Sequence, residues 1–140
     1  MKLKIKKVRP DAVVPRYAYD GDAGMDFYSN ENLVLKPSHR ALVRSGIAME
    51  FPKGYVALGW DKSGISKKGI KTMAGVIDSG YRGEIIFTLV NLSSKNYEVK
   101  KGQKIAQVLI QKVERPEVEI VSDLSETARG DGGFGSSGLG

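Results

Sequence analysis

The chain contains no cysteine and only one histidine, and these two scarcities exclude several kinds of site. Without cysteine there is no disulfide framework, no thiolate zinc site and no cysteine nucleophile. A single imidazole, that of His39, is too few for a nitrogen-ligated metal cage. Any metal that this protein uses is therefore expected to take oxygen ligands.

Long apolar runs are also missing from the sequence. The segment Met1 to Lys7 alternates lysine with leucine and isoleucine, which predicts neither a secretory signal nor a membrane span. We expect a cytoplasmic protein with no membrane partner. At 140 residues, with 41% hydrophobic and 27% charged residues, the chain has the size and composition of one soluble globular domain.

The charge balance is basic, with a formal net charge of +6, and this favours anionic partners. Nucleic acid, a membrane surface and a phosphorylated small molecule all fit that description. The lysines are scattered or lie in small clusters with few aromatic residues beside them, which is typical of a solvated surface. A nucleic-acid platform needs interleaved aromatic side chains, so we expect no nucleic-acid partner.

Short β-rich runs separated by turn residues dominate the chain, and no long stretch has a helical period. Ser63 to Lys68 is the best helical candidate, with Ser63 expected to cap a single turn and Gly69 to end it. The pattern predicts an all-β jelly roll or β-sandwich. The predicted strands are Leu3–Val8, Leu33–Leu35, Ala41–Val43, Tyr55–Trp60, Glu84–Leu92 and Lys104–Val113.

Two of these strands, Glu84–Leu92 and Lys104–Val113, are apolar on both alternating faces. In the first, the faces consist of Ile85, Phe87 and Leu89 and of Ile86, Val90 and Leu92. Such strands are usually covered from both sides. In so small a chain, this pattern indicates that a subunit interface covers the second face.

Composition changes near the C-terminus, where residues 128–140 (ARGDGGFGSSGLG) are dominated by glycine and serine. We therefore divide the chain into a β domain, residues 1–127, and a flexible arm, residues 128–140. A terminus without a role is one interpretation. The other is a lid, because Phe134 has no core to join and its ring is suited to stack on a base.

Four internal segments place acids, hydroxyls or amides among turn residues. Asp26 lies between apolar neighbours, so it needs either an ion-pair partner or a metal-bound water. Asp78 and Tyr81 share a predicted hairpin turn, which is either an ordinary turn or the site of a carboxylate base. The segments are Ala23–Ser29 (AGMDFYS), Asp61–Gly69 (DKSGISKKG), Met73–Ile85 (MAGVIDSGYRGEI) and Gly102–Gln107 (GQKIAQ).

Taken in order, AGMDFYS, DKSGIS, AGVIDSGYRGEI, GQKIAQ and RGDGGFGSSG resemble the five sequence motifs of the trimeric dUTPase family. The resemblance covers residues 23 to 138, and its third and fifth motifs are the most specific. It implies a jelly-roll homotrimer with exchanged C-terminal arms, in which each site is assembled from more than one subunit. The implied reaction is hydrolysis of dUTP to dUMP and pyrophosphate, assisted by Mg²⁺.

The same resemblance implies roles for individual residues. Asp78 is the expected general base that activates a water for attack on the α-phosphorus, and Tyr81 is expected to exclude a ribose 2′-hydroxyl. The main chain from Thr72 to Val76, with Gly75 permitting close approach, is expected to read uracil. Asp26 is expected to hold Mg²⁺ through a water molecule. The implied contacts to phosphate and base are Lys62, Ser63, Gly64, Gln107, Arg129, Phe134, Gly135, Ser136 and Ser137.

Lys62 departs from the family pattern, which more often has arginine before Ser-Gly, and a lysine lacks the bidentate fork. Gly80 is a smaller departure, since many relatives carry an acidic residue there. Two alternatives remain open. A dCTP deaminase, with or without dUTP hydrolysis, needs a glutamate base, and Glu84 is the nearest acid along the hairpin. A noncatalytic dUTPase-like binding module needs no base.

Overall fold

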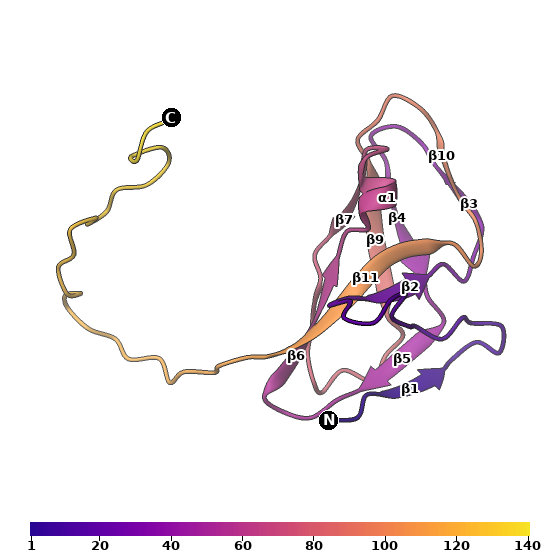
Figure 1. Cartoon of the computed structure of the whole chain (residues 1–140), viewed down its shortest axis with the longest axis horizontal. Helices are drawn as coiled ribbons and strands as arrows, with labels where there is room; N and C mark the ends of the chain where they lie inside the picture. The colour runs from indigo at the N-terminus through magenta and orange to yellow at the C-terminus, as the bar shows by residue number, and fades with distance from the viewer.

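The computed structural model describes residues 1–140 as antiparallel β-structure with one helical turn, which is too short to cross a bilayer (Figure 1). The all-β prediction is confirmed. The elements are β1 (Lys4–Lys7), β2 (Met25–Tyr28), β3 (Leu33–Leu35), β4 (Arg40–Arg44), β5 (Ile47–Glu50), β6 (Tyr55–Trp60), α1 (Ser63–Ser66), β7 (Ile70–Met73), β8 (Val76–Ile77), β9 (Ile86–Asn91), β10 (Tyr97–Val99) and β11 (Lys104–Lys112).

Two antiparallel sheets enclose the core, as expected for a jelly roll. One sheet has the strand order β2-β11-β6-β8 and the other has the order β4-β9-β7. Shorter ladders, β1-β5 and β3-β10, complete the fold. The rings of Phe27 on β2 and Phe87 on β9 meet edge to face with 5.5 Å between their centroids, so an aromatic contact joins the two sheets.

Strand β9 buries only one of its two apolar faces within the chain. Phe87 and Leu89 are buried, as is Ile85 just before the strand, whereas Ile86 and Leu92 are exposed. The predicted covering of the second face is therefore not supplied by this chain. The subunit interface that the sequence indicated stays a prediction.

The hairpin predicted for Met73 to Ile85 is wrong in its pairing. Strand β8 pairs with β6, whereas β9 pairs with β7, so the chain changes sheets between β7 and β8. Ala74 and Gly75 make this change with φ angles of 60° and 142°, values that L side chains adopt at a cost. The alternation of apolar and polar residues predicts where a strand lies in the sequence, but it does not predict to which sheet that strand belongs.

The predicted cap at Ser63 is also wrong. Lys62 is the N-cap residue of α1, with extended backbone angles, and no side chain caps the helix. Ser63 is the first helical residue, so its hydroxyl is one position too late to act as a cap. Gly69 ends the turn as expected, with a φ of 84° and its N–H donating to the carbonyl of Ser66 at 2.9 Å.

The C-terminal segment leaves the β body directly after β11. The N–H of Val113 donates to the carbonyl of Gly54 at 3.0 Å, and residues 114–126 make no main-chain hydrogen bond. Beyond them the segment has only local turns, and it extends far from both sheets (orange to yellow in Figure 1). The predicted arm, residues 128–140, is thus the last part of a longer exposed segment.

Replacing a core leucine should measure how much the closed sandwich contributes to stability. Leu89 on β9 is fully buried between the sheets. We expect Leu89→Ala to lower the free energy of unfolding by about 2–5 kcal/mol, because it removes apolar contacts and leaves a cavity. Urea denaturation followed by circular dichroism measures this change. Val34→Ala, on an exposed position of β3, is the control and should stay within about 0.5 kcal/mol of wild type. Equal losses of unfolding free energy in Leu89→Ala and Val34→Ala would contradict the packing of Leu89 between the two sheets.

Candidate active site

Two clefts contain most of the predicted site residues of the β body, and no lining residue belongs to both. The first, which we call the lysine cleft, has a volume of about 600 Å³. The second, the Asp78 cleft, has a volume of about 250 Å³. The lysine cleft is lined by Ala18, Tyr19, Asp22, Ala23, Gly24, Trp60, Asp61, Lys62, Ser63, Lys104, Gln107 and Leu109.

Asp26 lies behind the wall of the lysine cleft in an ion-pair cluster. Its carboxylate is buried, and its two oxygens lie 2.5 Å from Nζ of Lys62 and 2.7 Å from Nζ of Lys104. Burial by itself raises the pKa of Asp26, but the two ammonium groups outweigh burial and hold the pKa below its ordinary value. The pKa of Lys104 is raised in turn by its contact with Asp26.

This arrangement does not fit a metal ion bound directly by the protein. Both oxygens of Asp26 already face ammonium groups, and Asp26 is absent from the cleft wall. No group of three histidine or acidic side chains lies close enough together to hold an ion. The expected water-mediated contact between Asp26 and Mg²⁺ stays a prediction.

Asp61 connects the lysine cleft to strand β7. Its carbonyl accepts a hydrogen bond from Nε2 of Gln107 at 2.9 Å, which orients that amide in the cleft. Its carboxylate accepts the N–H of Thr72 at 2.6 Å and lies 2.5 Å from Nζ of Lys71. Burial raises the pKa of Asp61, but the Lys71 ammonium and the Thr72 N–H outweigh it and lower the pKa overall.

Ser63 and Gly64 open the helical turn beside the two lysines. Both residues are exposed, and their main-chain N–H groups make no hydrogen bond within the chain. Together with the Ser63 hydroxyl they are free donors at the lysine cleft, suited to anionic oxygens. The phosphate contacts predicted from the second and fourth motifs thus come from one cleft.

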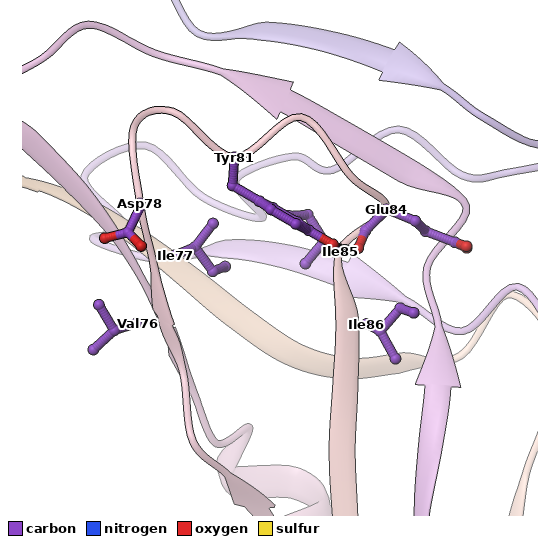
Figure 2. A pocket seen from close by; sticks show the side chains of 7 residues that line it. All are labelled: Val76, Ile77, Asp78, Tyr81, Glu84, Ile85 and Ile86. Atoms are coloured by element: carbon purple, nitrogen blue, oxygen red, sulfur yellow. Dashed lines mark hydrogen bonds between the residues drawn. The ribbon is translucent and has the colours of Figure 1, made fainter.

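The Asp78 cleft is built from β8, the loop after it and the start of β9 (Figure 2). Asp78 and Val76 point to one side of β8, and Ile77 points to the other (Figure 2). The Asp78 carboxylate is exposed and has no hydrogen bond or ion pair within the chain. A carboxylate in this state is open to water. The lining residues are Val76, Ile77, Asp78, Tyr81, Glu84, Ile85 and Ile86.

The ring of Tyr81 is held across the turn that follows Asp78. Its main-chain N–H donates to the carbonyl of Asp78 at 3.1 Å, and its hydroxyl donates to the carbonyl of Glu84 at 3.0 Å. A Cβ atom on Gly83 would lie 2.3 Å from the Tyr81 hydroxyl, so glycine leaves the space that the ring occupies. The predicted pair Asp78 and Tyr81 therefore lies on one hydrogen-bonded loop.

The carboxylate of Glu84 is occupied by contacts within the fold. Its carboxylate accepts the N–H of Gly46 at 2.9 Å, pairs with Arg44 at 2.8 Å and lies 3.6 Å from Arg9. Its two oxygens are therefore occupied by protein groups and are not free to contact a substrate. This surrounding argues against Glu84 as the base of a deaminase.

The main chain predicted to read uracil has two different surroundings. The N–H of Thr72 is already bonded to Asp61, and its side chain is buried. Gly75 approaches β6 closely, since a Cβ atom there would lie 2.5 Å from the carbonyl oxygen of Gly59. The need for glycine at position 75 thus comes from contact between strands. Val76 is exposed and borders the Asp78 cleft.

The arm residues reach neither cleft of their own chain. Phe134 is fully exposed, and Nε of Arg129 donates to the carbonyl of Gly132 at 2.9 Å, a local contact. Gly135, Ser136 and Ser137 are exposed as well. One chain therefore brings together the first, second and fourth motifs in one cleft, keeps the third in another, and leaves the fifth apart.

Comparison with known proteins identifies the family. The family model described as dUTPase matches residues 11–138. The chain belongs to the dUTPase family. It is 45% identical over 139 residues to the deoxyuridine 5′-triphosphate nucleotidohydrolase of Clostridium tetani, covering 97% of this chain and 96% of that one. It is 46% identical over 143 residues to the enzyme of the same name from a Hydrogenobaculum species, covering 99% of both.

Solved dUTPases share the fold as well. The Staphylococcus bacteriophage 80alpha dUTPase with dUPNHPP superposes with a TM-score of 0.93 at 30% identity, covering 99% of both chains. A mutant dUTPase from phage phi11 of S. aureus, described as coordinating a structural Mg(II) ion, gives a TM-score of 0.85 at 25% identity. It covers 90% of this chain and 100% of that one. The family predicted from the five motifs is confirmed.

Sequence reasoning missed two residues of the lysine cleft, Asp61 and Lys104. Both adjoin predicted motifs, but their roles arise from partners far along the chain. Lys104 reaches Asp26 because β11 pairs with β2, with a register shift between Lys104 and Ala106. The alternation of apolar and polar residues along a strand does not predict the register in which that strand pairs with another.

Asp61 should make the stability of the dUTPase fold depend on pH. Because folding lowers its pKa below the ordinary 3.8, the unfolded chain takes up the proton first as the pH falls. The stabilisation is therefore present above that value and is lost as the pH falls through the lowered pKa.

We expect Asp61→Asn to lower the free energy of unfolding by about 1 kcal/mol at neutral pH, because it removes the pair with Lys71. The difference in unfolding free energy between Asp61→Asn and wild type should become smaller as the pH falls below the ordinary carboxyl pKa of 3.8. Urea denaturation at a series of pH values on both sides of that pKa measures this change. Asp123→Asn, whose exposed carboxylate makes no such contact, is the control. A difference that stays constant with pH would show that Asp61 is not the titrating group.

Proposed function

We propose that this dUTPase-family protein hydrolyses dUTP to dUMP and pyrophosphate, with the magnesium complex of dUTP as its substrate. The observation that carries the proposal is the Asp78 carboxylate, which is exposed, unpaired and fixed beside Tyr81. Relatives more than 40% identical over nearly the whole chain are named deoxyuridine 5′-triphosphate nucleotidohydrolases. Both observations support the same reaction.

Asp78 serves as the general base in this proposal. It accepts a proton from a water molecule while the water oxygen attacks the α-phosphorus. The new bond joins that oxygen to phosphorus, the bond to the bridging oxygen of the β-phosphate breaks, and pyrophosphate leaves. The lack of any ion pair at Asp78 supports the role, because both of its oxygens are free to contact that water.

Tyr81 selects the sugar in this proposal. Its ring packs against the deoxyribose, and a 2′-hydroxyl would meet the ring without a hydrogen-bond partner. The bond to the carbonyl of Glu84 and the space left by Gly83 fix the ring in place. A fixed ring excludes the extra hydroxyl more strictly than a mobile one.

The lysine cleft supplies the phosphate contacts, through Lys62, Ser63, Gly64 and Gln107. The arm adds Arg129, Gly135, Ser136 and Ser137, with Phe134 stacking on uracil, and the main chain from Thr72 to Val76 reads the base. Magnesium comes with the phosphate chain and offsets its negative charge. The solved phi11 relative described as coordinating a structural Mg(II) ion supports the use of this ion in the family.

The division of the site supports a homotrimer with exchanged arms. Because the two clefts share no residue and the arm reaches neither, a complete site needs parts from more than one chain. The outer face of the β4-β9-β7 sheet carries exposed Leu42, Met73 and Ile86, an apolar surface suited to a neighbouring copy.

The segment before the arm also has the pattern of an exchanged strand. In residues 117–121 (EVEIV), glutamates alternate with exposed Val118 and Ile120, while β1 alternates Lys4 and Lys6 with Ile5. The outer edge of β1 makes no hydrogen bond to another strand. Charge and apolar periodicity therefore match between this segment and the β1 edge of another copy.

The role of Asp78 has a direct test. We expect Asp78→Asn to lower kcat by about 10²–10⁴-fold, because the amide keeps the shape but accepts no proton. Affinity for a nonhydrolysable dUTP analogue should stay close to that of wild type. Pyrophosphate release and calorimetric binding measure the two quantities, with Asp20→Asn as the exposed control. Turnover near the wild-type rate in Asp78→Asn would remove Asp78 from its role.

Substrate choice separates the proposed reaction from its alternatives. We expect pyrophosphate release from dUTP but not from dCTP, dTTP or UTP, and loss of release when a chelator removes Mg²⁺. Ammonia release from dCTP would assign the protein to the deaminases instead. Binding of nucleotides without any turnover would indicate a noncatalytic module.

A further inference from the structure

The loop that carries Asp78 and Tyr81 has little hydrogen bonding within its own main chain. Residues 78–83, between β8 and β9, make one main-chain hydrogen bond, from the N–H of Tyr81 to the carbonyl of Asp78 at 3.1 Å. The loop follows β8, a strand of only two residues at the edge of its sheet. A segment with so few main-chain bonds opens easily unless side chains hold it.

Arg82 supplies two further hydrogen bonds to this loop. Its Nη1 atom donates to the carbonyl of Ser79 at 2.8 Å and to the carbonyl of Tyr81 at 3.1 Å. One carbonyl lies within the turn and the other directly after it, so a single nitrogen joins the two parts of the loop. The two N–H groups on Nη1 match these two acceptors.

The bridge made by Arg82 fixes Tyr81 relative to Asp78. Tyr81 is held at three points, since its N–H bonds to Asp78, its carbonyl accepts from Arg82 and its hydroxyl bonds to the carbonyl of Glu84. Asp78 lies at the start of the loop and Tyr81 beyond its turn (Figure 2). The orientation of the carboxylate relative to the ring therefore depends on the shape of the turn, and Arg82 holds that shape.

The rest of the Arg82 side chain makes weaker contacts. The side chain is 55% exposed, and it pairs with Glu50 across 3.9 Å from Nε to Oε2. An exposed ion pair at this distance contributes little. Arg82 also lines neither the Asp78 cleft nor the lysine cleft. The bonds to the two loop carbonyls are therefore the contacts through which it acts.

We propose that Arg82 is a positioning residue, which sets the orientation of the Asp78 carboxylate relative to the Tyr81 ring through its bonds to the carbonyls of Ser79 and Tyr81. The effect on catalysis and on sugar selection rests on the proposed function. The effect on the loop itself does not, because it is a property of the protein without substrate.

Hydrogen–deuterium exchange of the ligand-free, full-length protein tests the loop without any reaction. Arg82→Met keeps most of the apolar stem and removes both donors. We expect the Tyr81 amide to exchange about tenfold faster in this variant than in wild type, because opening of the loop becomes less costly. Amides of the central strand β11 are the internal reference and should exchange at the wild-type rate. Unchanged exchange at Tyr81 would overturn the proposal.

Steady-state kinetics with dUTP and UTP test the consequence for the reaction. We expect Arg82→Met to lower kcat for dUTP by about 10- to 100-fold, because the base is less well placed. The ratio of kcat/KM for dUTP to that for UTP should fall by about tenfold, because a less fixed Tyr81 ring tolerates the 2′-hydroxyl. A smaller amount of folded enzyme would lower both values equally, so an unchanged ratio would overturn the role in positioning.

Two more variants separate the carbonyl bonds from the charge of Arg82. Glu50→Gln removes the ion pair but leaves both carbonyl bonds, so exchange at Tyr81 and the substrate ratio should stay within about twofold of wild type. Losses as large as those of Arg82→Met would overturn the proposal. Arg82→Lys keeps one nitrogen with several N–H groups, so it should recover part of both losses. A lysine variant that behaves as Arg82→Met does would count against the carbonyl bonds.

Circular dichroism and light scattering check that each variant keeps the fold and the assembly of wild type. If Arg82→Met does not fold, Arg82→Gln takes its place with the same expectations, because its shorter side chain cannot bridge both carbonyls. Failure of wild type to release pyrophosphate from dUTP would overturn the proposed function. The exchange measurement would then still decide whether Arg82 holds the loop.

Discussion

The close contact between the main chains of Gly59 and Gly75 lies where the chain passes from β7 to the loop that carries Asp78. The N–H of Gly59 donates to the carbonyl of Gly75 at 2.7 Å, and a Cβ atom on Gly75 would lie 2.5 Å from the carbonyl oxygen of Gly59. This contact draws the chain out of the β7 sheet and pairs β8 with β6. The loop carrying Asp78 then follows β8 at the edge of the β2-β11-β6-β8 sheet, and it lines a different cleft from the two lysines. Glycine is therefore required at position 75, where the chain passes from one sheet to the other.

Three carboxylates of similar intrinsic acidity take different roles because their surroundings differ. Glu84 is neutralised by Arg9 and Arg44 and bonded to the main chain of Gly46, so it fixes the turn. Asp26 is buried and pairs with the ammonium groups of Lys62 and Lys104. Asp78 has no partner and remains open to water. Of the three, only Asp78 offers unpaired oxygens to a water molecule.

Sequence reasoning succeeded where the signal was local. The strands at residues 33–35 and 55–60 have the predicted bounds, and Asp78 and Tyr81 share the predicted loop, because alternation and turn residues act over a few positions. It failed where pairing between distant strands decides the outcome. The partner of β8 and the contact of Lys104 with Asp26 both depend on ladder register, including the shift in β11. No local pattern contains that information.

The position of Trp60 gives the protein an optical property. It is the only tryptophan of the chain, and it borders both the lysine cleft and the hollow beside Gly75. Its side chain is half exposed, so its indole fluorescence depends on the water that surrounds it. A ligand that displaces this water, or an arm that covers it, changes the emission of a single fluorophore. The intrinsic fluorescence of Trp60 should therefore report whether a ligand occupies the lysine cleft, without any added label.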